Sequence, residues 1–381
     1  MKIAFDVQPL IDSQKTGVGM YTHFVIKSMF EKFPSNTYIL RYFTSSNGCL
    51  DDIKVFCDQG CILDKCSWFR AWMYKVLWTF LPLPYGIFFH KKAEVTQFFN
   101  YHVPPFVPGK SVVVVYDMVY KSFPETVRWK TKIMLDMNLK ASCRRADRII
   151  TISEFSKREI MKYFKVSSKK ITVAYCGVDR SVFNENIPEE TICKVLNKFS
   201  LPRKYLLYLG TLEPRKNIER LIEAYSVIKR EKPEETPVLV IAGRKGWMYD
   251  SIFEKVRKLD LHDSIIFTGY IEDNDVPVLM RGALVFLFPS LYEGFGLPVL
   301  EAMACGTPVL TSTASSLPEV AADSALLVDP YSVNDIAEAM NSLTQDETLR
   351  NELSQKGMAR ADVFSWNATA ETFMNIFRQL H

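Results

Sequence analysis

The sequence lacks the patterns that would assign a metal site or a secretory route. Its eight cysteines include Cys57, Cys61 and Cys66, whose uneven spacing does not match the paired ligands of a zinc site. We therefore expect structural thiols in a reducing compartment and no bound metal. The first residues lack a basic leader, a long apolar run and a cleavage site, so no signal peptide is predicted and the expected location is cytoplasmic.

Two classes of function are disfavoured by missing motifs. In neither half is the first expected strand followed by a Gly-x-Gly-x-x-Gly phosphate loop and a later ribose-binding acid. This absence argues against a nicotinamide dehydrogenase. No zinc-finger spacing or RNA-binding signature accompanies the basic residues, so nucleic acid is not an expected partner. The aromatic stretch 68–89 contains Arg70, Lys75, Pro82 and Pro84, which makes it a poor membrane span.

The sequence does have a strong charge asymmetry. Residues 1–185 carry 27 Lys and Arg against 16 Asp and Glu, a net charge of +11, whereas the remainder carries 20 against 27, a net charge of −7. The basic half predicts an anionic partner. Trp68, Trp72 and Trp78 beside basic residues indicate peripheral contact with an anionic membrane, at the inner face of the plasma membrane. A helix packed on the domain core is the alternative.

Short apolar, β-branched runs alternate with longer helical patterns, which predicts an α/β chain with two doubly wound parallel sheets. The expected strands are 3–7, 38–42, 95–98, 112–116, 148–152 and 171–174 in the first half, and 205–209, 238–242, 265–268, 284–288, 308–311 and 325–328 in the second. The polar segment 186–203, with a short helix at 190–199, is the expected linker between domains at 1–185 and 204–364. An amphipathic helix over 365–381 completes the chain.

The most informative segment is 293–308, in which two carboxylates flank a predicted helix start. Pro298 suits the first helical position, and Gly306 and then Pro308 end the helix, so Glu293 lies in the entering loop and Glu301 in the first helical turns. Free amide donors and the positive end of the helix dipole favour a diphosphate there, and a carboxylate can accept hydrogen bonds from sugar hydroxyls. The alternative is a tight turn followed by a solvated first-turn acid.

A basic pair follows the first expected strand of the second half. Arg215 can offer two parallel hydrogen bonds to a phosphate and Lys216 a compact positive charge, so both can stabilise a leaving diphosphate. On its own the pair would fit a solvated basic turn. Phosphate binding is favoured because ligands of parallel sheets bind at the carboxyl ends of the strands, where the Glu293 segment also lies.

Several motifs together resemble one enzyme family. They are the segments 17–21, 151–156, 176–179, 213–217, 242–247, 267–270, 288–292, 316–320 and 364–366. Their order and spacing cover nearly the whole chain and resemble the retaining GT-B glycosyltransferases of family 4 (glycosyl transferases group 1), closest to the bacterial mannosyltransferase B-like group. The resemblance implies the GT-B fold, in which a Rossmann-like acceptor-binding domain and a Rossmann-like sugar-nucleotide-binding domain face a central cleft. The last helix then crosses back to the first domain.

The resemblance also implies a role for each site residue. Arg215 and Lys216 would hold the donor diphosphate, Glu301 would accept hydrogen bonds from the ribose, and Glu293 would contact the transferred sugar. Further donor contacts are implied for Gly17 and Gly19 in a loop of the first domain, and for Gly269, Tyr270, Gly294, Phe295, Gly296 and Leu297 in the second. The implied reaction uses no cofactor and no metal, because the cations and the helix dipole stabilise the leaving group.

The chain departs from the family pattern after the fourth expected strand of the first half. Many relatives have His-Asp there, with the His facing the sugar, whereas this chain has Tyr116-Asp117. Tyrosine is a poorer proton acceptor at neutral pH, although its hydroxyl can donate a hydrogen bond to a sugar. Asp117 is expected to contact the sugar or acceptor, and capping of the following turn is the alternative. Thr211 stands where relatives carry a basic residue, which leaves more of the phosphate binding to Arg215 and Lys216.

The implied activity is transfer of a hexose, with GDP-mannose as the expected donor and a glycan or lipid-linked oligosaccharide of a surface polysaccharide as the acceptor. UDP-glucose, UDP-galactose and UDP-N-acetylglucosamine stay open as donors, because motifs that bind phosphate and ribose identify neither the base nor the epimer. A non-catalytic sugar-nucleotide-binding partner of another transferase is the alternative from a different class. The intact set of Glu293, Glu301, Arg215 and Lys216 argues against it.

Overall fold

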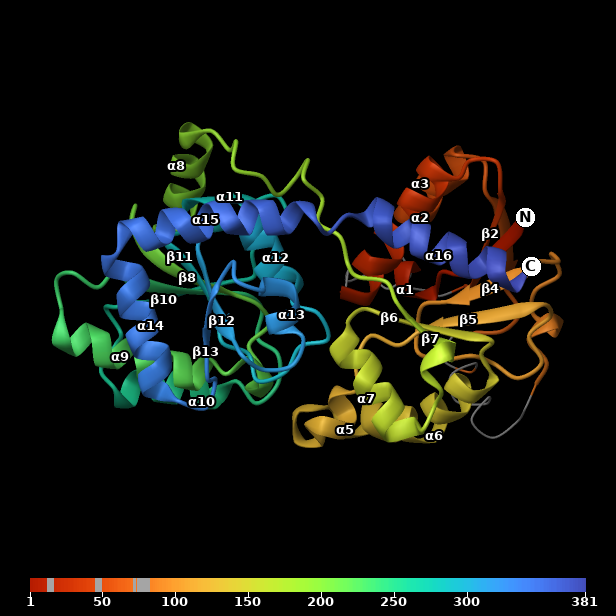
Figure 1. The fold of residues 1–381 in the computed structure, drawn as a ribbon, viewed down its shortest axis with the longest axis horizontal. Coiled ribbons are helices and arrows are strands. Elements are labelled where there is room, and N and C mark those ends of the chain that lie inside the picture. The colour runs from red at the N-terminus through yellow and green to blue at the C-terminus, as the bar shows by residue number, and fades with distance from the viewer. Residues whose placement is uncertain (12–16, 45–49, 71–72, 74–82) are drawn as a thin grey trace. The chain divides into compact units, whose positions relative to one another are not determined.

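The computed structural model describes residues 1–11, 17–44, 50–70, 73 and 83–381. They form two compact units, one made of Met1–Gly177 with Ser365–His381 and the other of Val178–Phe364. Each unit contains one sheet with helices around it (Figure 1). The α/β class and the two parallel sheets predicted from the sequence are confirmed.

The first unit is built on a seven-stranded sheet with the order β3-β2-β1-β4-β5-β6-β7, in which every pairing is parallel. Its strands are β1 (Lys2–Asp6), β2 (Thr37–Phe43), β3 (Ile62–Cys66), β4 (Val95–Phe98), β5 (Lys110–Val114), β6 (Arg148–Thr151) and β7 (Ile171–Val173). The chain winds outward from β1 to β3 and then returns to place β4 on the other side of β1. The winding direction therefore reverses between β1 and β4, which is where open α/β sheets bind ligands.

The sequence pattern does not predict β3. This strand lies at the edge of the sheet, its residues Ile62 and Leu63 are exposed, and two of its five residues are charged. An edge strand can form with little apolar burial because only one side of it pairs. Its Asp64 lies 3.4 Å from the buried Arg41 Nε of β2, so a charge pair anchors it instead of an apolar run.

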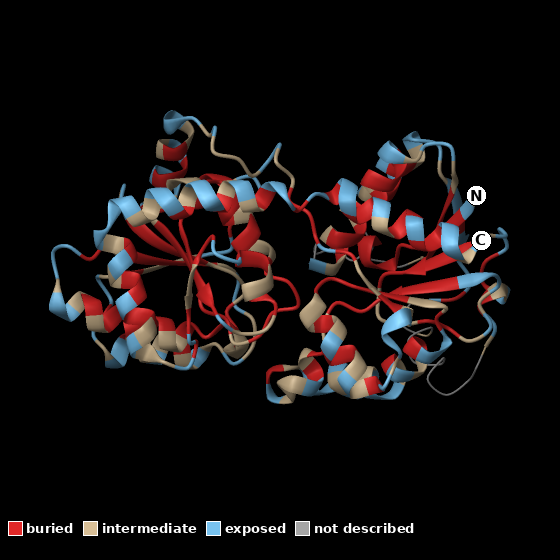
Figure 2. Cartoon of the chain, in the orientation of Figure 1, coloured by how far each residue is buried: buried red, intermediate tan, exposed pale blue. Residues whose placement is uncertain are grey.

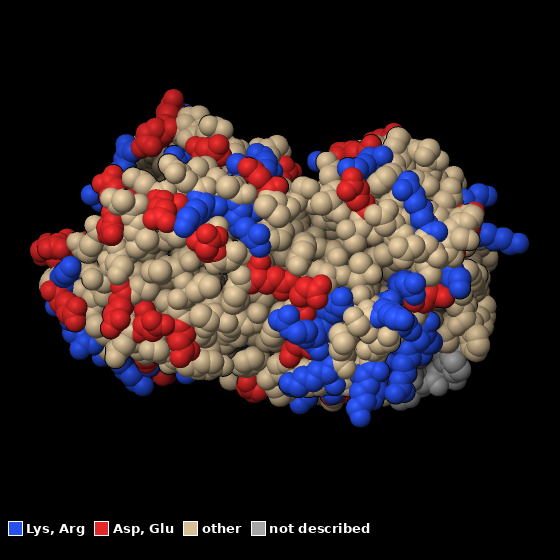
Figure 3. Space-filling model, in the orientation of Figure 1, with Lys and Arg blue, Asp and Glu red and all other residues tan. Residues whose placement is uncertain are grey.

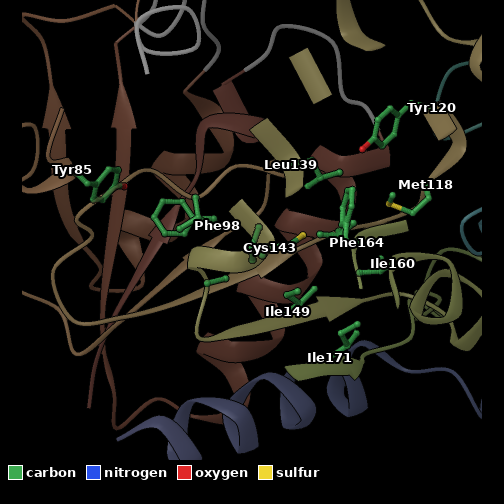
Figure 4. Close-up of a cluster of buried hydrophobic side chains, with 14 of the residues drawn as sticks. Tyr85, Phe98, Met118, Tyr120, Leu139, Cys143, Ile149, Ile160, Phe164 and Ile171 are labelled. Carbon is green, nitrogen blue, oxygen red and sulfur yellow. The ribbon is translucent and has the colours of Figure 1, made fainter. Parts of the chain in front are cut away.

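Helices of the first unit are α1 (Gln8–Ile11), α2 (Gly17–Lys32), α3 (Asp51–Asp58), α5 (Val119–Ser122), α6 (Trp129–Arg145), α7 (Glu154–Phe164) and α16 (Trp366–Leu380), with 3-10 turns η1 (Tyr85–Ile87), η2 (Pro124–Thr126) and η3 (Ser168–Lys170). A buried cluster joins the sheet to α6 and α7: Figure 4 shows Phe98 of β4, Leu139 and Cys143 of α6, and Ile160 and Phe164 of α7. This core buries one face of α6, and the opposite face of the helix lies at the surface of the unit.

The C-terminal helix α16 packs on α2 and so belongs to the first unit. Phe373 and Phe377 are buried, and the Trp366 ring stacks on Phe24 with centroids 5.1 Å apart. The Thr369 hydroxyl donates to the Tyr175 carbonyl at 2.6 Å. The amphipathic pattern of the last residues therefore reflects burial against the first sheet's helices rather than a solvated surface helix.

The second unit is built on a six-stranded parallel sheet with the order β10-β9-β8-β11-β12-β13. Its strands are β8 (Tyr205–Leu209), β9 (Val238–Ala242), β10 (Ile265–Gly269), β11 (Val285–Phe288), β12 (Val309–Ser312) and β13 (Leu326–Val328). Its helices are α8 (Glu189–Lys198), η4 (Pro214–Lys216), α9 (Ile218–Glu231), α10 (Asp250–Lys258), α11 (Val276–Gly282), α12 (Leu297–Ala304), α13 (Leu317–Ala321), α14 (Val333–Gln345) and α15 (Glu347–Asp362). The winding direction reverses between β8 and β11.

The segment 186–203, expected as a linker, lies within the second unit. Its helix α8 packs on α11, a helix of the second unit, and buries Ile192, Val195 and Leu196 there. The polar residues that suggested a linker occupy the outer face of this helix. The change of unit occurs earlier, between Gly177 and Val178.

The inner strands of both sheets are mostly buried, whereas the edge strands β3, β7, β10 and β13 are partly exposed (Figure 2). No helix in the described ranges is long and apolar enough to span a membrane. The predicted membrane contact of Trp72 and Trp78 lies outside the described residues, and Trp68, whose side chain is exposed, stacks on Phe88 with centroids 5.2 Å apart.

Candidate functional site

Charged residues of the second unit meet where β8 and β11 end, at the reversal of the winding. Strand β8 leads into η4, which carries Arg215 and Lys216, and β11 leads into the loop that contains Glu293. The Leu291 amide donates to the Arg215 carbonyl at 2.8 Å, so the two loops are joined by their backbones. Because β8 and β11 are neighbours, residues about 77 positions apart in the sequence lie side by side.

Four of these side chains form one paired cluster. Lys216 Nζ lies 2.6 Å from Glu293 Oε1, and Arg215 Nη1 lies 3.1 Å from Glu293 Oε2. Arg215 Nε in turn lies 2.6 Å from Glu213 Oε1. Glu213, Lys216 and Glu293 are buried, so Glu293 uses both of its oxygens to hold the two cations predicted to bind phosphate. We define these four residues as the charge cluster.

Burial and pairing shift the protonation of the cluster in opposite directions. Burial pushes the pKa of Glu293 upward, but the charges of Lys216 and Arg215 outweigh it and hold the pKa below the usual value for glutamate. Burial lowers the pKa of Lys216 despite the neighbouring Glu293, and burial raises the pKa of Glu213. The site thus keeps a Glu293 carboxylate beside a lysine that is easier to deprotonate than a solvated one.

Backbone geometry around Asn217 holds the cationic turn in place. Asn217 has a left-handed conformation with φ of 62°, which a short polar side chain tolerates well. Its amide group donates to the Pro289 carbonyl at 3.0 Å and to the Pro330 carbonyl at 2.7 Å. The turn after β8 is therefore tied to the loops after β11 and β13, which fixes where the two cations point.

The predicted helix start after Glu293 is present as α12, with Pro298 in its first turn. Gly296 precedes it with φ of 109°, and a Cβ there would lie 2.7 Å from Leu317 Cδ2, so only glycine fits. The Ser316 hydroxyl lies 2.9 Å from the Glu293 carbonyl and 2.8 Å from that of Phe295. The amide-rich loop 294–297 is thereby held beside the charge cluster, at the positive end of the helix dipole.

Glu301 lies on α12, outside the charge cluster. Burial, together with the negative charge of Asp273, raises its pKa to about 7. Gly269 is the last residue of β10 and Tyr270 follows it, and this strand is separated from β8 by β9. The Tyr270 ring is exposed, and the Arg244 guanidinium lies over it, with Cζ 5.1 Å from the ring centroid. These residues border the same edge of the sheet as the cluster, as the sequence predicts.

In the first unit, the expected glycine loop is part of a helix. Gly17 and Gly19 are the first and third residues of α2, so the prediction of a loop was wrong at these positions. The sequence 17–32 contains no proline and few β-branched residues, and helical hydrogen bonding extends to its start. A Cβ at Gly17 would meet no atom of the described residues within 4 Å, so none of them demands glycine there.

Tyr116 is a core residue and not a sugar-facing one. It is buried, its ring lies 5.3 Å from those of Tyr21 and Tyr101, and its hydroxyl donates to the Phe99 carbonyl at 3.0 Å. Its single proton is thus already used, which corrects the expectation that the hydroxyl could serve a sugar. Asp117 Oδ1 accepts from the Val119 amide at 3.1 Å, the turn cap that was the alternative for this residue.

Sequence reasoning missed a cavity in the first unit. The cavity has a volume of about 80 Å³ and lies where β1 and β4 end, at the reversal of that sheet's winding. It is lined by Asp6, Gln8, Phe98, Asn100, Tyr101, His102, Met134, Leu135, Asn138 and Leu139. Carboxylate and amide groups beside an aromatic ring are the groups that bind neutral polyols. The lining residues come from three segments that are distant in the sequence, so no local motif predicts the cavity.

Sequence reasoning also missed Tyr208, on β8. Its hydroxyl is buried and has no hydrogen-bond partner within the described ranges. Burial raises its pKa, and the negative charges of Glu293 and Glu213 raise it further. No group of three His, Cys, Asp or Glu side chains in the described part of the chain could hold a metal ion.

Comparison with known proteins supports the assignment of the two units. Residues 67–182 match the model of Glycosyltransferase Family 4, and residues 194–360 match Glycosyl transferases group 1. The chain is 36% identical over 288 residues to O-antigen chain mannosyltransferase B of Escherichia coli, which covers 74% of each chain. It is 34% identical over 276 residues to serotype-specific mannosyltransferase WbdA of Escherichia coli, of which it spans about a third (72% of this chain, 34% of that protein).

The fold agrees with a solved structure at much lower identity. Sucrose-phosphate synthase from Thermosynechococcus elongatus superposes with a TM-score of 0.76 at 19% identity, over all of this chain and 99% of that one. The paired sheets are therefore those of the GT-B fold. Together with the two family matches and the E. coli relative, they show that this chain belongs to the glycosyltransferases of family 4, group 1.

Proposed function

We propose that this glycosyltransferase moves mannose from GDP-mannose to a glycan or lipid-linked acceptor in the synthesis of a surface polysaccharide. The names of its E. coli relatives, an O-antigen chain and a serotype-specific mannosyltransferase, support this sugar and this class of acceptor. The observation that carries the proposal is the charge cluster, in which one buried carboxylate holds two cations beside a helix start.

The donor diphosphate would take the place that Glu293 holds on the cations. Lys216 donates one hydrogen bond to Glu293, and its ammonium lies 4.7 Å from the Phe288 ring centroid, so among the described residues it has N–H donors left for phosphate oxygens. Arg215 can add a planar, multiply donating partner. A carboxylate displaced from them stays close by, where it can accept a hydrogen bond from a hydroxyl of the transferred sugar.

The chemistry follows from this placement. The bond between the anomeric carbon and the diphosphate oxygen breaks while the acceptor oxygen bonds to the same carbon on the same face, and the acceptor proton passes to a phosphate oxygen. Arg215, Lys216 and the α12 amides stabilise the negative charge that grows on the diphosphate. The leaving group itself accepts the proton, which fits a chain whose Tyr116 is buried in the core.

The acceptor would bind the cavity where β1 and β4 end. Asp6, Asn100 and Asn138 offer acceptors and amide donors for sugar hydroxyls, and Tyr101 offers an aromatic face. We also propose that no metal is needed, because the two cations already supply the positive charge. Activity should then be unchanged by excess EDTA, and loss of activity that added Mg²⁺ restores would refute this part.

Thermal stabilisation by nucleotides tests the donor site. A ligand that binds only the folded protein raises the melting temperature, and at about 1 mM, GDP should do so while leaving Lys216→Met unshifted. Absence of any shift with GDP, UDP and ADP would refute the site. Turnover with GDP-mannose, compared with UDP-glucose, UDP-galactose and UDP-N-acetylglucosamine, then tests the donor. Preferential turnover of a UDP-sugar would replace mannose with that sugar.

A further inference from the structure

Within the described part of the chain, the hydroxyl of Tyr208 on β8 is buried without a hydrogen-bond partner. Tyr205 on the same strand is equally buried, but its hydroxyl donates to the Leu279 carbonyl at 2.7 Å. Burying a hydroxyl without a hydrogen bond costs free energy, and most buried hydroxyls therefore have a partner. The exception at Tyr208 needs a physical reason.

Tyr208 lies beside the residues that carry the charge cluster. Its Oη borders the backbone of Gly210, the first residue after β8, where an added Cβ would come within 2.9 Å of it. The Tyr208 ring lies nearly parallel to that of Phe288 at the end of β11, with centroids 6.1 Å apart. The Lys216 ammonium lies 4.7 Å from the centroid of the same Phe288 ring. The hydroxyl is therefore at the edge of the sheet where Lys216 holds Glu293.

Binding of a diphosphate would leave one buried charge of the cluster without its partners. Acidic and basic side chains are spread over the face of the second unit that Figure 3 shows, whereas Glu213, Lys216 and Glu293 are buried. The cluster pairs two cations with two carboxylates. If a diphosphate takes Arg215 and Lys216, Glu293 stays in the site as a carboxylate with new negative charge beside it. A buried carboxylate without a hydrogen-bond donor is costly, so the site needs one that the cations do not supply.

We propose that the Tyr208 hydroxyl receives the Glu293 carboxylate when the donor diphosphate displaces it from the cations. This role rests on the donor site of the proposed function, and it makes Tyr208 a positioning residue that acts through Glu293. Burial raises the pKa of Tyr208 well above its usual value, and the charge of Glu293 raises it further, so the hydroxyl keeps its proton and donates. Glycine at 210 leaves that side of Oη uncovered by a side chain. The hydroxyl has no partner in the free protein because its partner arrives with the donor.

Stability without ligand separates an unused hydroxyl from an ordinary buried one. Tyr208→Phe removes a hydroxyl that has no partner among the described residues, so the melting temperature should stay unchanged or rise. The matched control is Tyr205→Phe on the same strand, which removes the hydrogen bond to the Leu279 carbonyl and should lower the melting temperature by about 2–4 °C. An equal fall in both variants would show that Tyr208 has a structural partner, and the proposal would be wrong.

Nucleotide binding should rank the same two variants in the opposite order. In Tyr208→Phe the displaced carboxylate lacks its donor, so the Kd for GDP should rise roughly tenfold to a hundredfold, the effect of one hydrogen bond to a charged group. Tyr205→Phe should bind GDP as the parent chain does. With GDP-mannose, KM should rise in Tyr208→Phe while kcat stays within about threefold, because the carboxylate is displaced in both the donor complex and the transition state. An unchanged Kd in Tyr208→Phe would overturn the role of the hydroxyl.

A double-mutant cycle with Glu293→Gln tests whether Tyr208 acts through Glu293. The neutral amide costs far less than a carboxylate when it lacks a donor, so adding Tyr208→Phe to this variant should change the Kd for GDP by less than about threefold. A tenfold or larger loss in the Glu293→Gln background would show that the hydroxyl contacts the nucleotide directly, which contradicts the positioning role.

Failure of the proposed function has a different signature in the same measurements. A parent chain that binds none of GDP, UDP and ADP would refute the donor site and the role of Tyr208 with it. A parent chain that binds UDP in place of GDP would change only the donor, and the same ratios of Kd measured with UDP would support Tyr208. Normal binding of GDP by the parent chain and by Tyr208→Phe alike would refute the role of Tyr208 and leave the donor site standing.

Discussion

The two sheets carry different chemistry at the same topological position. Where β8 and β11 end, at the reversal of the second sheet, the charge cluster forms three ion pairs of 3.1 Å or less, and all of its side chains except that of Arg215 are buried. Where β1 and β4 end, at the reversal of the first sheet, the cavity is lined by Asp6, amides and aromatic or aliphatic side chains. On the proposed function, the first position would bind the charged diphosphate of the donor and the second the neutral hydroxyls of the acceptor.

In the proposed sugar transfer, the second sheet would bind the donor and the first sheet the acceptor. A diphosphate is recognised by formal charge, which a few fixed cations supply, whereas a sugar hydroxyl is recognised by the geometry of neutral donors and acceptors. Changes at the second sheet should therefore cost stability and turnover together. Changes at the first sheet should alter acceptor use and leave the donor untouched.

The largest expected effect is on stability, from Glu293→Ala. Removing this carboxylate leaves the buried Lys216 without its ion-pair partner, whereas Arg215 keeps Glu213, so the free energy of unfolding should fall by about 3–5 kcal/mol. The matched control is Glu190→Ala, whose carboxylate also lies 2.6 Å from a lysine, Lys194, but belongs to a side chain of α8 that is 79% exposed. Urea denaturation should show less than about 0.5 kcal/mol for the control, and equal losses in both variants would contradict the burial argument.

Lys216→Met should have the largest effect on catalysis. It removes a buried cation while keeping the length and packing of the side chain, and kcat/KM for the donor should fall by roughly 10²–10³ because leaving-group stabilisation is lost. Binding of the nucleoside diphosphate should weaken as well. By contrast, Glu293→Gln should lower kcat strongly and leave nucleotide affinity largely intact. Equal loss of affinity in the two variants would remove the separate roles given to cation and carboxylate.

The sequence predicted the second region better than the first. The apolar runs correspond to twelve of the thirteen described strands, because buried parallel strands need continuous apolar residues. Arg215, Lys216 and Glu293 could be found because local motifs of loop and helix start mark phosphate binding. That one oxygen of Glu293 holds Lys216 could not be predicted, since it follows from the pairing of β8 with β11, which no local pattern encodes.

The first region shows what local patterns miss. Gly17 and Gly19 suggested a turn, but their backbone continues the helix, and Tyr116 suggested a site residue although its ring fills the core. The cavity draws Asp6 from β1 and Asn138 from α6, which tertiary packing alone brings together. A neutral site spread over three segments leaves no charge or glycine signature in the sequence.

Asn100→Ala and Asn138→Ala test whether the cavity of the first unit binds the acceptor. Each removes amide groups that could hydrogen-bond a sugar hydroxyl, so KM for the acceptor should rise roughly tenfold. KM for the donor and its slow hydrolysis in the absence of acceptor should stay at the parent values, which provides an internal control. A parallel rise in KM for the donor would show that the two regions are not chemically separate.

The pH dependence of donor binding should report on Glu301. Its raised pKa of about 7 means that the side chain is largely protonated below that pH and a carboxylate above it. Because only the carboxylate accepts hydrogen bonds from both ribose hydroxyls, affinity for the nucleotide sugar should rise up to about tenfold from pH 6 to pH 8. In Glu301→Gln the slope should disappear. An unchanged slope in that variant, measured by calorimetry, would remove Glu301 from the ribose site.

The smallest effect on activity is expected at Tyr116, and it tests the contrast most sharply. Tyr116→Phe deletes the hydroxyl that donates to the Phe99 carbonyl and leaves this buried acceptor without its partner, so stability should fall by roughly 1–2 kcal/mol. The ring contacts with Tyr21 and Tyr101 remain, so the core keeps its shape. If the first unit contributes only neutral acceptor recognition, kcat/KM should stay within about twofold of the parent once both proteins are folded. A loss of a hundredfold or more would instead make the Tyr116 hydroxyl part of the reaction, and the first sheet would then supply chemistry as well as binding.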